Sequence, residues 1–200
     1  PKNPDQRKIK IAVDMLKKGG VIIYPTDTVY ALGCDAFNKK ALEKLCMIKR
    51  INIKNHNLSF ICYDLSHISD FTKHLSTPIY KLMKKYLPGP YTFILKSNNK
   101  IPRMFKNKKK EIGIRVPNNN IVREIVKEFG GPITSTSIKD KDKLLEYSTD
   151  PELIKEYYSK QVDLIINGGY GGNIPSTIIR CTENIPEIIR KGKGDLKLCF

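Results

Sequence analysis

Several short runs of hydroxyl-bearing and charged residues follow apolar stretches of the sequence. The first is the segment 25–30, Pro-Thr-Asp-Thr-Val-Tyr, which comes directly after the apolar residues 21–24. At the end of a buried strand, the hydroxyls of Thr26 and Thr28 and the carboxylate between them could bind the polar end of a small ligand. The alternative is a turn that only caps the next element, which for this segment taken alone is the more common case.

Arg115 stands inside an otherwise apolar segment, residues 112–117 with the sequence Ile-Gly-Ile-Arg-Val-Pro. This composition is typical of a buried strand. Burying a guanidinium group without a partner is costly. We therefore expect Arg115 to face an anion or a cleft, and we favour a functional role for it over a structural one.

Two further hydroxyl clusters each follow glycines. Residues 135–137, Ser-Thr-Ser, come after Gly130 and Gly131, and residues 175–180, Pro-Ser-Thr-Ile-Ile-Arg, come after a segment with four glycines between positions 168 and 172. Glycine lets the backbone approach a phosphate group closely, and hydroxyl groups add hydrogen-bond donors. Either cluster alone is a weak signal for a ligand.

Two pairs of cations complete the set. Lys49 and Arg50 end a predicted helix, and Arg190 and Lys191 stand in a basic segment with two glycines. Adjacent cations can bind phosphate groups. Each pair also has a plainer explanation, because cations stabilise the C-terminus of a helix and short basic segments are commonly solvated.

The signatures of several enzyme classes are missing. The sequence has no Gly-x-x-x-x-Gly-Lys-Ser/Thr loop, no complete dinucleotide fingerprint and no Gly-x-Ser-x-Gly. None of the five cysteines forms a Cys-x-x-Cys pair, and the three histidines lie in one stretch far from most of the cysteines. We therefore expect reduced thiols and no metal site of the protein's own.

The composition fits one folded domain over residues 1–200, with 40% apolar and 28% charged residues. No apolar run approaches the length of a membrane span and no apolar leader is present, so we expect a cytoplasmic protein without a membrane partner. The net charge of +16 would attract polyanions such as nucleotides or RNA. A solvated lysine-rich surface explains the charge equally well.

The spacing of apolar residues predicts an irregular order of helices and strands. Helices are expected over 5–18, 39–50, 66–75, 78–86, 118–129 and 152–160, and strands over 21–24, 58–63, 91–96, 111–116, 132–136, 162–167, 176–181 and 187–190. Residues 98–110 are expected to form a lysine-rich loop, and 139–147 a mobile surface segment. Because several strands follow one another directly, we predict a mixed α/β or α+β sheet rather than a strict βαβ repeat.

Taken in order, these clusters resemble the YrdC-like family of threonylcarbamoyl-AMP synthases. The family pattern Pro-Thr-Asp/Glu-Thr-x-Tyr-Gly-Leu, Lys-x-Arg, Gly-Pro-x-Thr, Val/Ile-Arg-x-Pro, Ser-Ala-Asn, Ser-Thr-Ile and Arg-x-Gly is matched by residues 25–32, 49–50, 89–92, 114–117, 135–137, 176–178 and 190–192. The resemblance spans about residues 9–194. The chain departs from the pattern at Ala31 in place of the glycine, at Ile51 in place of the arginine of Lys-x-Arg, and at Lys139 in place of the asparagine.

The resemblance implies a twisted mixed β-sheet flanked by helices around a positively charged cleft. It also implies a nucleotidyltransferase that makes threonylcarbamoyl-AMP from L-threonine, bicarbonate and ATP and releases pyrophosphate. The product would pass to partner proteins that modify the adenosine next to the tRNA anticodon. Mg²⁺ would arrive on the ATP phosphates rather than in a protein cage, and the segment 139–147 is a candidate lid.

The positions of the family pattern imply a division of the site. Threonine would be bound by Thr26, Thr28, Arg115, Ser135 and Ser176. ATP would be bound by Lys49, Arg50, Asn57, Ser137 and Arg190, with Lys49 and Arg50 as the catalytic pair. Hydroxyls and cations suit a reaction that needs positioning and charge neutralisation more than a strong base.

Two alternatives remain open from the sequence. A non-catalytic module of the same fold that binds tRNA or double-stranded RNA would explain the +16 charge and the altered Lys-x-Arg, although no known RNA-binding motif is present. A related enzyme could instead transfer a carbamoyl group to a different acceptor.

Overall fold

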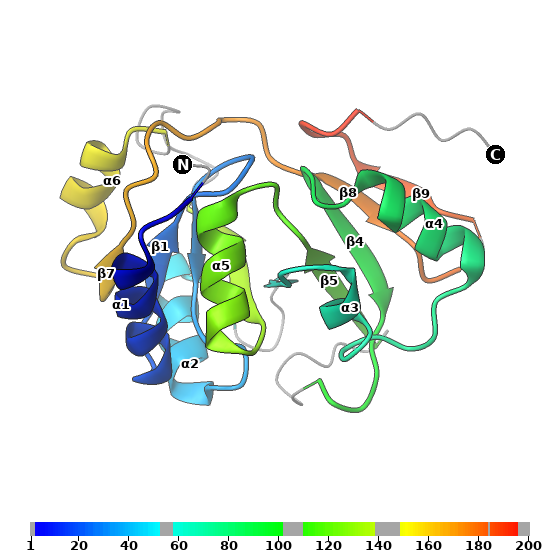
Figure 1. Ribbon diagram of the computed structural model, residues 1–200, viewed down its shortest axis with the longest axis horizontal. Helices are drawn as coiled ribbons and strands as arrows, with labels where there is room; N and C mark the ends of the chain where they lie inside the picture. Colours follow the sequence, from blue (N-terminus) through cyan, green and yellow to red (C-terminus); the bar gives the residue numbers. More distant parts are fainter. Residues whose placement is uncertain (1–2, 53–57, 102–109, 139–148, 184, 196–200) are drawn as a thin grey trace.

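One nine-stranded β-sheet runs through the computed structural model, which describes residues 3–52, 58–101, 110–138, 149–183 and 185–195 (Figure 1). In these ranges the strands lie in the order β7-β1-β2-β6-β3-β5-β4-β8-β9. Their bounds are β1 Ile22–Tyr24, β2 Ala31–Gly33, β3 Ser59–Ile61, β4 Tyr91–Lys96, β5 Glu111–Arg115, β6 Ile133–Ser137, β7 Leu164–Ile165, β8 Thr177–Arg180 and β9 Glu187–Arg190.

The sheet mixes parallel and antiparallel pairs. The pairs β1–β7, β3–β5 and β4–β8 are parallel, and the pairs β1–β2, β2–β6, β3–β6, β4–β5 and β8–β9 are antiparallel. The prediction of a mixed sheet without a strict βαβ repeat is therefore confirmed.

Helices flank the sheet at both ends. They are α1 Gln6–Lys17, α2 Lys39–Lys49, α3 Leu65–Ile68, α4 Thr77–Tyr86, α5 Asn120–Phe129 and α6 Pro151–Tyr158. Helices α1 and α5 stand side by side at the β1 end, whereas α3 and α4 lie at the end formed by β4, β8 and β9 (Figure 1).

The alternation of side chains along β1 explains why helices cover both faces of the sheet at this end. Ile22 and Tyr24 belong to the hydrophobic cluster that contains Leu16 of α1 and Val126 of α5. Ile23 points the other way, into the cluster that contains α2. Each helix covers its face with a stripe at helical spacing, as the sequence predicts.

Helix α5 is closely defined at both ends. The side chain of Asn119 accepts hydrogen bonds from the N–H groups of Ile121 (3.0 Å) and Val122 (3.4 Å), and Gly130 ends the helix at φ 79°. That left-handed conformation favours glycine. The helix therefore stops at Phe129, as the sequence predicts, but starts two residues later than predicted. Ile121, Val122 and two further apolar side chains are buried.

The helix predicted over 66–75 is wrong in length. Helix α3 ends at Ile68, because Phe71 turns into the core and Thr72 pairs with Ser97 in an isolated antiparallel bridge.

Strand β2 is absent from the predictions, and its three residues join β1 to β6. The strand expected over 162–167 contains the two residues of β7. Most of the lysine-rich loop and the whole of the segment 139–147 lie outside the described residues.

We predict that Asn119→Ala lowers the free energy of unfolding by about 1 kcal/mol, because two N–H groups of α5 lose their acceptor. Urea unfolding followed by circular dichroism measures the change. Lys127→Ala, on the exposed side of the same helix, is the control and should change stability by less than about 0.5 kcal/mol. Equal effects of the two substitutions would show that the cap contributes nothing.

Candidate functional site

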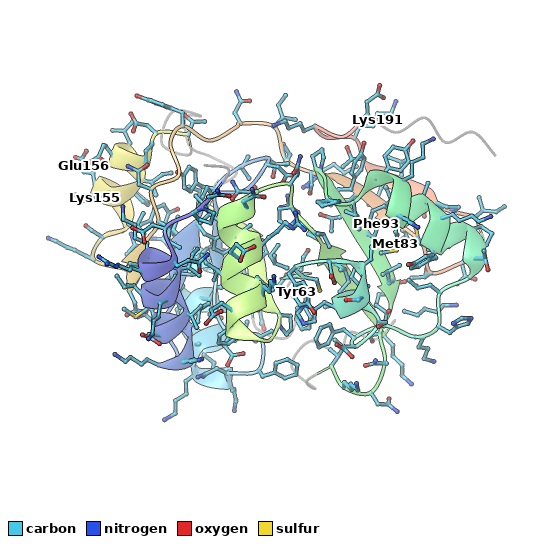
Figure 2. The ribbon with its side chains drawn as sticks, viewed as in Figure 1. Tyr63, Met83, Phe93, Lys155, Glu156 and Lys191 are labelled. Carbon is cyan, nitrogen blue, oxygen red and sulfur yellow. The ribbon has the colours of Figure 1, made fainter. Side chains whose placement is uncertain are left out.

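A cavity of about 440 Å³ opens over one face of the central strands. Alternate residues of neighbouring strands line it, as expected for side chains that share one face of a sheet. Thr92 and Ile94 of β4 line the cavity, while Phe93 between them points to the opposite face, where it lies in the same core cluster as Met83 of α4 (Figure 2).

Strand register brings distant residues together on this face. Ser135 pairs with Ser59, Ser59 pairs with Gly113, Gly113 pairs with Ile94, and Ile94 pairs with Arg180. All five line the cavity. The floor therefore combines five strands that are separated by up to 121 positions in the chain, which no local pattern in the sequence could reveal.

Arg115 ends β5 and is held by the segment 25–30. One terminal nitrogen donates to Asp27 Oδ1 (3.2 Å) and to Thr28 Oγ1 (3.0 Å). The side chains of Arg115 and Asp27 are only 8% and 9% exposed. Burial lowers the pKa of Arg115 and the Asp27 carboxylate opposes this shift, so the guanidinium stays charged. The second carboxylate oxygen of Asp27 accepts from the N–H of Asn118 (2.9 Å).

The Nε–H of Arg115 is buried and has no hydrogen-bond partner among the described residues. A buried donor without an acceptor is costly. Because Arg115 lines the cavity, an anionic ligand bound there could supply the missing acceptor. The expectation that this arginine faces an anion or a cleft agrees with its position, although the sequence does not predict that its first partner is Asp27.

The two threonines of the segment 25–30 have different positions. Thr28 lines the cavity, whereas Thr26 lies behind it, with 3.0 Å between their hydroxyl oxygens. The Thr26 hydroxyl donates its proton to the carbonyl of Val29 (2.7 Å). Thr28 must therefore be the donor in the contact between the hydroxyls, so that its oxygen can only accept further hydrogen bonds.

A second guanidinium group faces the cavity from β9. Arg190 donates to the carbonyl oxygen of Ser176 from Nε (3.2 Å) and from a terminal nitrogen (2.8 Å), and the Ser176 hydroxyl lies 2.8 Å from that of Thr92. Burial lowers the pKa of Arg190, and the positive charge of Arg115 lowers it further. Two cations that repel one another across a cavity favour an anion between them.

Ser135 and Ser137 enter the cavity from β6. The Ser135 side chain is buried and hydrogen-bonds the hydroxyl of Tyr24. Burial raises the pKa of Tyr24, and this hydrogen bond and the charge of Arg115 oppose the rise only in part. Ser137 lies two residues nearer the end of the strand and is half-buried. Both serines therefore line the cavity from β6, whereas Arg190 lines it from β9.

The cavity brings together Thr28, Arg115, Ser135, Ser137, Ser176 and Arg190 of the predicted site. Lys49 and Arg50 are not among the described residues that line it. The Nζ of Lys49 donates to the carbonyl of Ile138 (3.4 Å), and Arg50 is exposed at the end of α2 with φ 52°. Asn57 lies outside the described residues.

Some lining residues escape the sequence-based prediction. Ser59, Glu111 and Arg180 all line the cavity. Only strand register could have identified Ser59 and Glu111, whereas Arg180 ends the recognised cluster 175–180 but was not assigned to the site. Asp27 stands inside the recognised segment 25–30. Its negative charge could have indicated an ion pair with Arg115, which the sequence predicts to be buried. Gly172 approaches the carbonyl of Thr28 so closely that a Cβ would collide with it, so this glycine is required by packing within the protein.

The structure thus defines a mixed α/β protein with a cavity on its sheet that is lined by arginine and hydroxyl side chains. A family model for Sua5, YciO and YrdC proteins, described as telomere recombination, matches residues 14–192. The chain belongs to this Sua5/YciO/YrdC family.

The chain is similar to YciO proteins and to threonylcarbamoyl-AMP synthases. The uncharacterized protein YciO of Escherichia coli K12 is 44% identical over 98% of this chain and 95% of its own, and its crystal structure superposes with a TM-score of 0.89. The threonylcarbamoyl-AMP synthase of Cellvibrio japonicus is 27% identical over 86% of this chain and 90% of its own. Sua5 of P. abyssi, solved with L-threonine, has a TM-score of 0.85 at 26% identity, over 95% of this chain and 55% of the P. abyssi protein.

Two kinds of feature are absent from the described residues. Among them, no helix is long and apolar enough to cross a membrane. Nor do they contain a group of three or more histidine, cysteine, aspartate or glutamate side chains arranged to hold a metal ion.

We predict that Asp27→Asn lowers the free energy of unfolding by about 3–5 kcal/mol, because it leaves the Arg115 charge buried without its carboxylate partner. Urea unfolding measures the loss. The matched control is Glu43→Gln, whose partner Lys39 lies 3.7 Å away in a largely exposed pair, and which should cost less than about 0.5 kcal/mol. A loss for Asp27→Asn no larger than that of the control would mean that the buried pair does not stabilise the fold.

Proposed function

We propose that this protein binds L-threonine and ATP in the cavity and forms threonylcarbamoyl-AMP from them with bicarbonate, releasing pyrophosphate. The observation that carries the proposal is the buried Arg115, whose Nε–H points to no acceptor among the described residues of the cavity wall. The relatives named threonylcarbamoyl-AMP synthase support the reaction, and the P. abyssi Sua5 complex supports the amino acid.

The carboxylate of threonine would accept from Arg115. An arginine fixed by Asp27 and Thr28 loses little side-chain entropy when it binds a carboxylate. The oxygen of Thr28, which can only accept, suits the ammonium or amine of the amino acid. Ser135 and Ser176 would then contact the remaining polar atoms from two sides of the cavity.

The reaction needs two bond-forming steps. The threonine amine attacks bicarbonate to give the carbamate and water. A carbamate oxygen then attacks the α-phosphorus of ATP, and the bond between the α-phosphorus and the bridging oxygen breaks, so that pyrophosphate leaves with its Mg²⁺. Both steps depend on orientation and on neutralising negative charge. Arg190, clamped on the carbonyl of Ser176, and Ser137 are the described cavity residues that we assign to the nucleotide.

The Lys-x-Arg departure requires a different arrangement at the phosphates. Ile51 stands where the family pattern has arginine, and it is half-buried against the main core cluster. Lys49 bonds the carbonyl of Ile138, the residue after Ser137. We assign Lys49 and Arg50, with Asn57, to the outer phosphates of ATP. The product would then pass to partner proteins that modify tRNA.

The test of the proposed function is pyrophosphate release with L-threonine, bicarbonate and ATP-Mg²⁺. We expect release that requires all of these components, with threonylcarbamoyl-AMP identified by mass spectrometry. Replacing threonine by serine, alanine or glycine tests the alternative of another carbamoyl acceptor. If a folded preparation releases no threonine-dependent pyrophosphate while a known synthase does so in the same assay, the proposal is wrong.

We predict that Arg115→Lys weakens the apparent affinity for threonine by about 10- to 100-fold. The lysine keeps the charge beside Asp27 but removes the Nε–H that would reach the carboxylate, and hydrogen bonds to charged groups contribute about 1.5–3 kcal/mol. Calorimetric titration with threonine measures the change. Arg123→Lys, at an arginine whose Nε donates to the Tyr63 carbonyl away from the cavity, should leave the affinity unchanged. A wild-type affinity in Arg115→Lys would assign Arg115 a structural role only.

The net charge of +16 favours a second candidate function, a module that binds tRNA without turnover. Binding through phosphate contacts weakens steeply as salt is raised. Filter binding of tRNA at several salt concentrations, with and without ATP and threonine, separates the two functions. Steeply salt-dependent binding in a protein that releases no pyrophosphate would favour the RNA-binding function.

A further inference from the structure

The end of the cavity away from Arg115 has a different chemistry from the rest. Glu111, four residues before Arg115 on β5, and Arg180 of β8 both line it. The Oε2 atom of Glu111 lies 3.9 Å from Nε of Arg180, and Arg180 also donates to Glu187 (3.2 Å). A carboxylate and a guanidinium group therefore stand side by side in a cavity whose other polar side chains are cations and hydroxyls.

This polar pair has capacity left for a ligand. The Nε of Arg180 is buried and has no hydrogen-bond partner among the described residues, since 3.9 Å is beyond hydrogen-bond range. A carboxylate can accept about four hydrogen bonds, so that Glu111 can serve a ligand while it keeps its protein neighbours. Glu111 is 14% exposed at its side chain, enough for one edge of a small molecule.

The pair lies at the right distance from the rest of the proposed site. Four residues of strand separate Glu111 from Arg115, about 13 Å. Ser135, Ser59 and Gly113 are register partners across β6, β3 and β5. Because β6 and β5 run in opposite directions, Ser137 and Glu111 both lie two residues from this row on the same side. They are therefore about 10 Å apart, across two strand spacings. A nucleoside whose phosphate lies near Ser137 can reach Glu111 with its base.

Apolar side chains lie beside the pair. Ile94 is the register partner of Arg180, and Ile178 also contributes to the lining. Aliphatic side chains next to a small number of placed polar groups are the usual surroundings of a bound aromatic ring. The flat face of a base can rest on these isoleucines while its edge meets Glu111 and Arg180.

We propose that Glu111 and Arg180 read the edge of the nucleobase and make the cavity selective for adenine. The proposal rests on the proposed function, because that function supplies the nucleotide. Adenine presents an amino donor beside a ring-nitrogen acceptor, which matches a carboxylate beside a guanidinium N–H. Hypoxanthine, the base of inosine, has a carbonyl oxygen in place of the amino group and would set that oxygen against the carboxylate.

The experiment compares equilibrium binding of ATP and ITP by calorimetry, with Mg²⁺ and without threonine or bicarbonate. Wild-type protein should bind ATP at least about tenfold more tightly than ITP, since a mismatched buried polar group costs about 1.4 kcal/mol or more. Glu111→Gln should bring the ATP to ITP ratio close to one, because an amide can donate to the carbonyl of hypoxanthine. Arg180→Lys, which keeps the charge but removes Nε–H, should also reduce the ratio.

Glu187→Gln is the matched control. Glu187 pairs with the same arginine but is 64% exposed and does not line the cavity. The substitution should leave the ratio at its wild-type value. The proposal is overturned if Glu111→Gln and Arg180→Lys both keep the wild-type ratio, or if Glu187→Gln lowers it as much as they do, because the ion pairs would then act only on the sheet.

The binding ratio separates this proposal from the proposed function. Selective ATP binding that Glu111→Gln abolishes, in a protein that releases no pyrophosphate, would support the base-reading pair and reject the synthase reaction. Pyrophosphate release with equal use of ATP and ITP would support the synthase reaction and reject the base-reading pair. Failure to bind either nucleotide would overturn both.

Discussion

The buried guanidinium of Arg115 is the group on which the rest of the site depends. Its charge sits at the end of β5, almost without contact with solvent, and Asp27 and Thr28 hold it from a segment far away in the chain. A buried charge is tolerated only when it is paired and hydrogen-bonded. This requirement fixes the segment 25–30 against β5, and through Asn118 it also fixes the loop that leads into α5.

Several contacts then hold the segment 25–30 in place. The Tyr30 hydroxyl donates to the carbonyl of Gly169 (2.7 Å) and accepts from the N–H of Gly168 (2.9 Å), so that the glycine-rich loop packs behind the segment. Lys193 donates to the carbonyl of Asp27 from beyond β9. Elements from both ends of the sheet thus converge on six residues. These contacts hold the segment without any ligand, and an arrangement that exists before binding lowers the entropic cost of binding.

The cavity joins two chemistries on one face of the sheet. Near Arg115 and Arg190, two cations that repel one another and several hydroxyls favour a carboxylate or phosphate. Near Glu111 and Arg180, a carboxylate and a guanidinium group lie beside isoleucines. An elongated ligand with an anionic end and a flat polar edge fits this order. The sheet register, rather than any loop, sets the spacing between the two ends.

The sequence by itself determined the elements and the clusters. Helix α5 follows from its apolar spacing, its Asn119 cap and Gly130, and Arg115 in an apolar strand was recognisable because burying an unpaired charge is costly. What only the tertiary structure decided is which residues meet. Ser59, Glu111 and Arg180 reach the cavity through pairing between strands far apart in the chain, and Asp27 rather than a ligand is the first partner of Arg115. Strand pairing depends on backbone hydrogen bonds that every sequence can make, so local residue types carry little information about it.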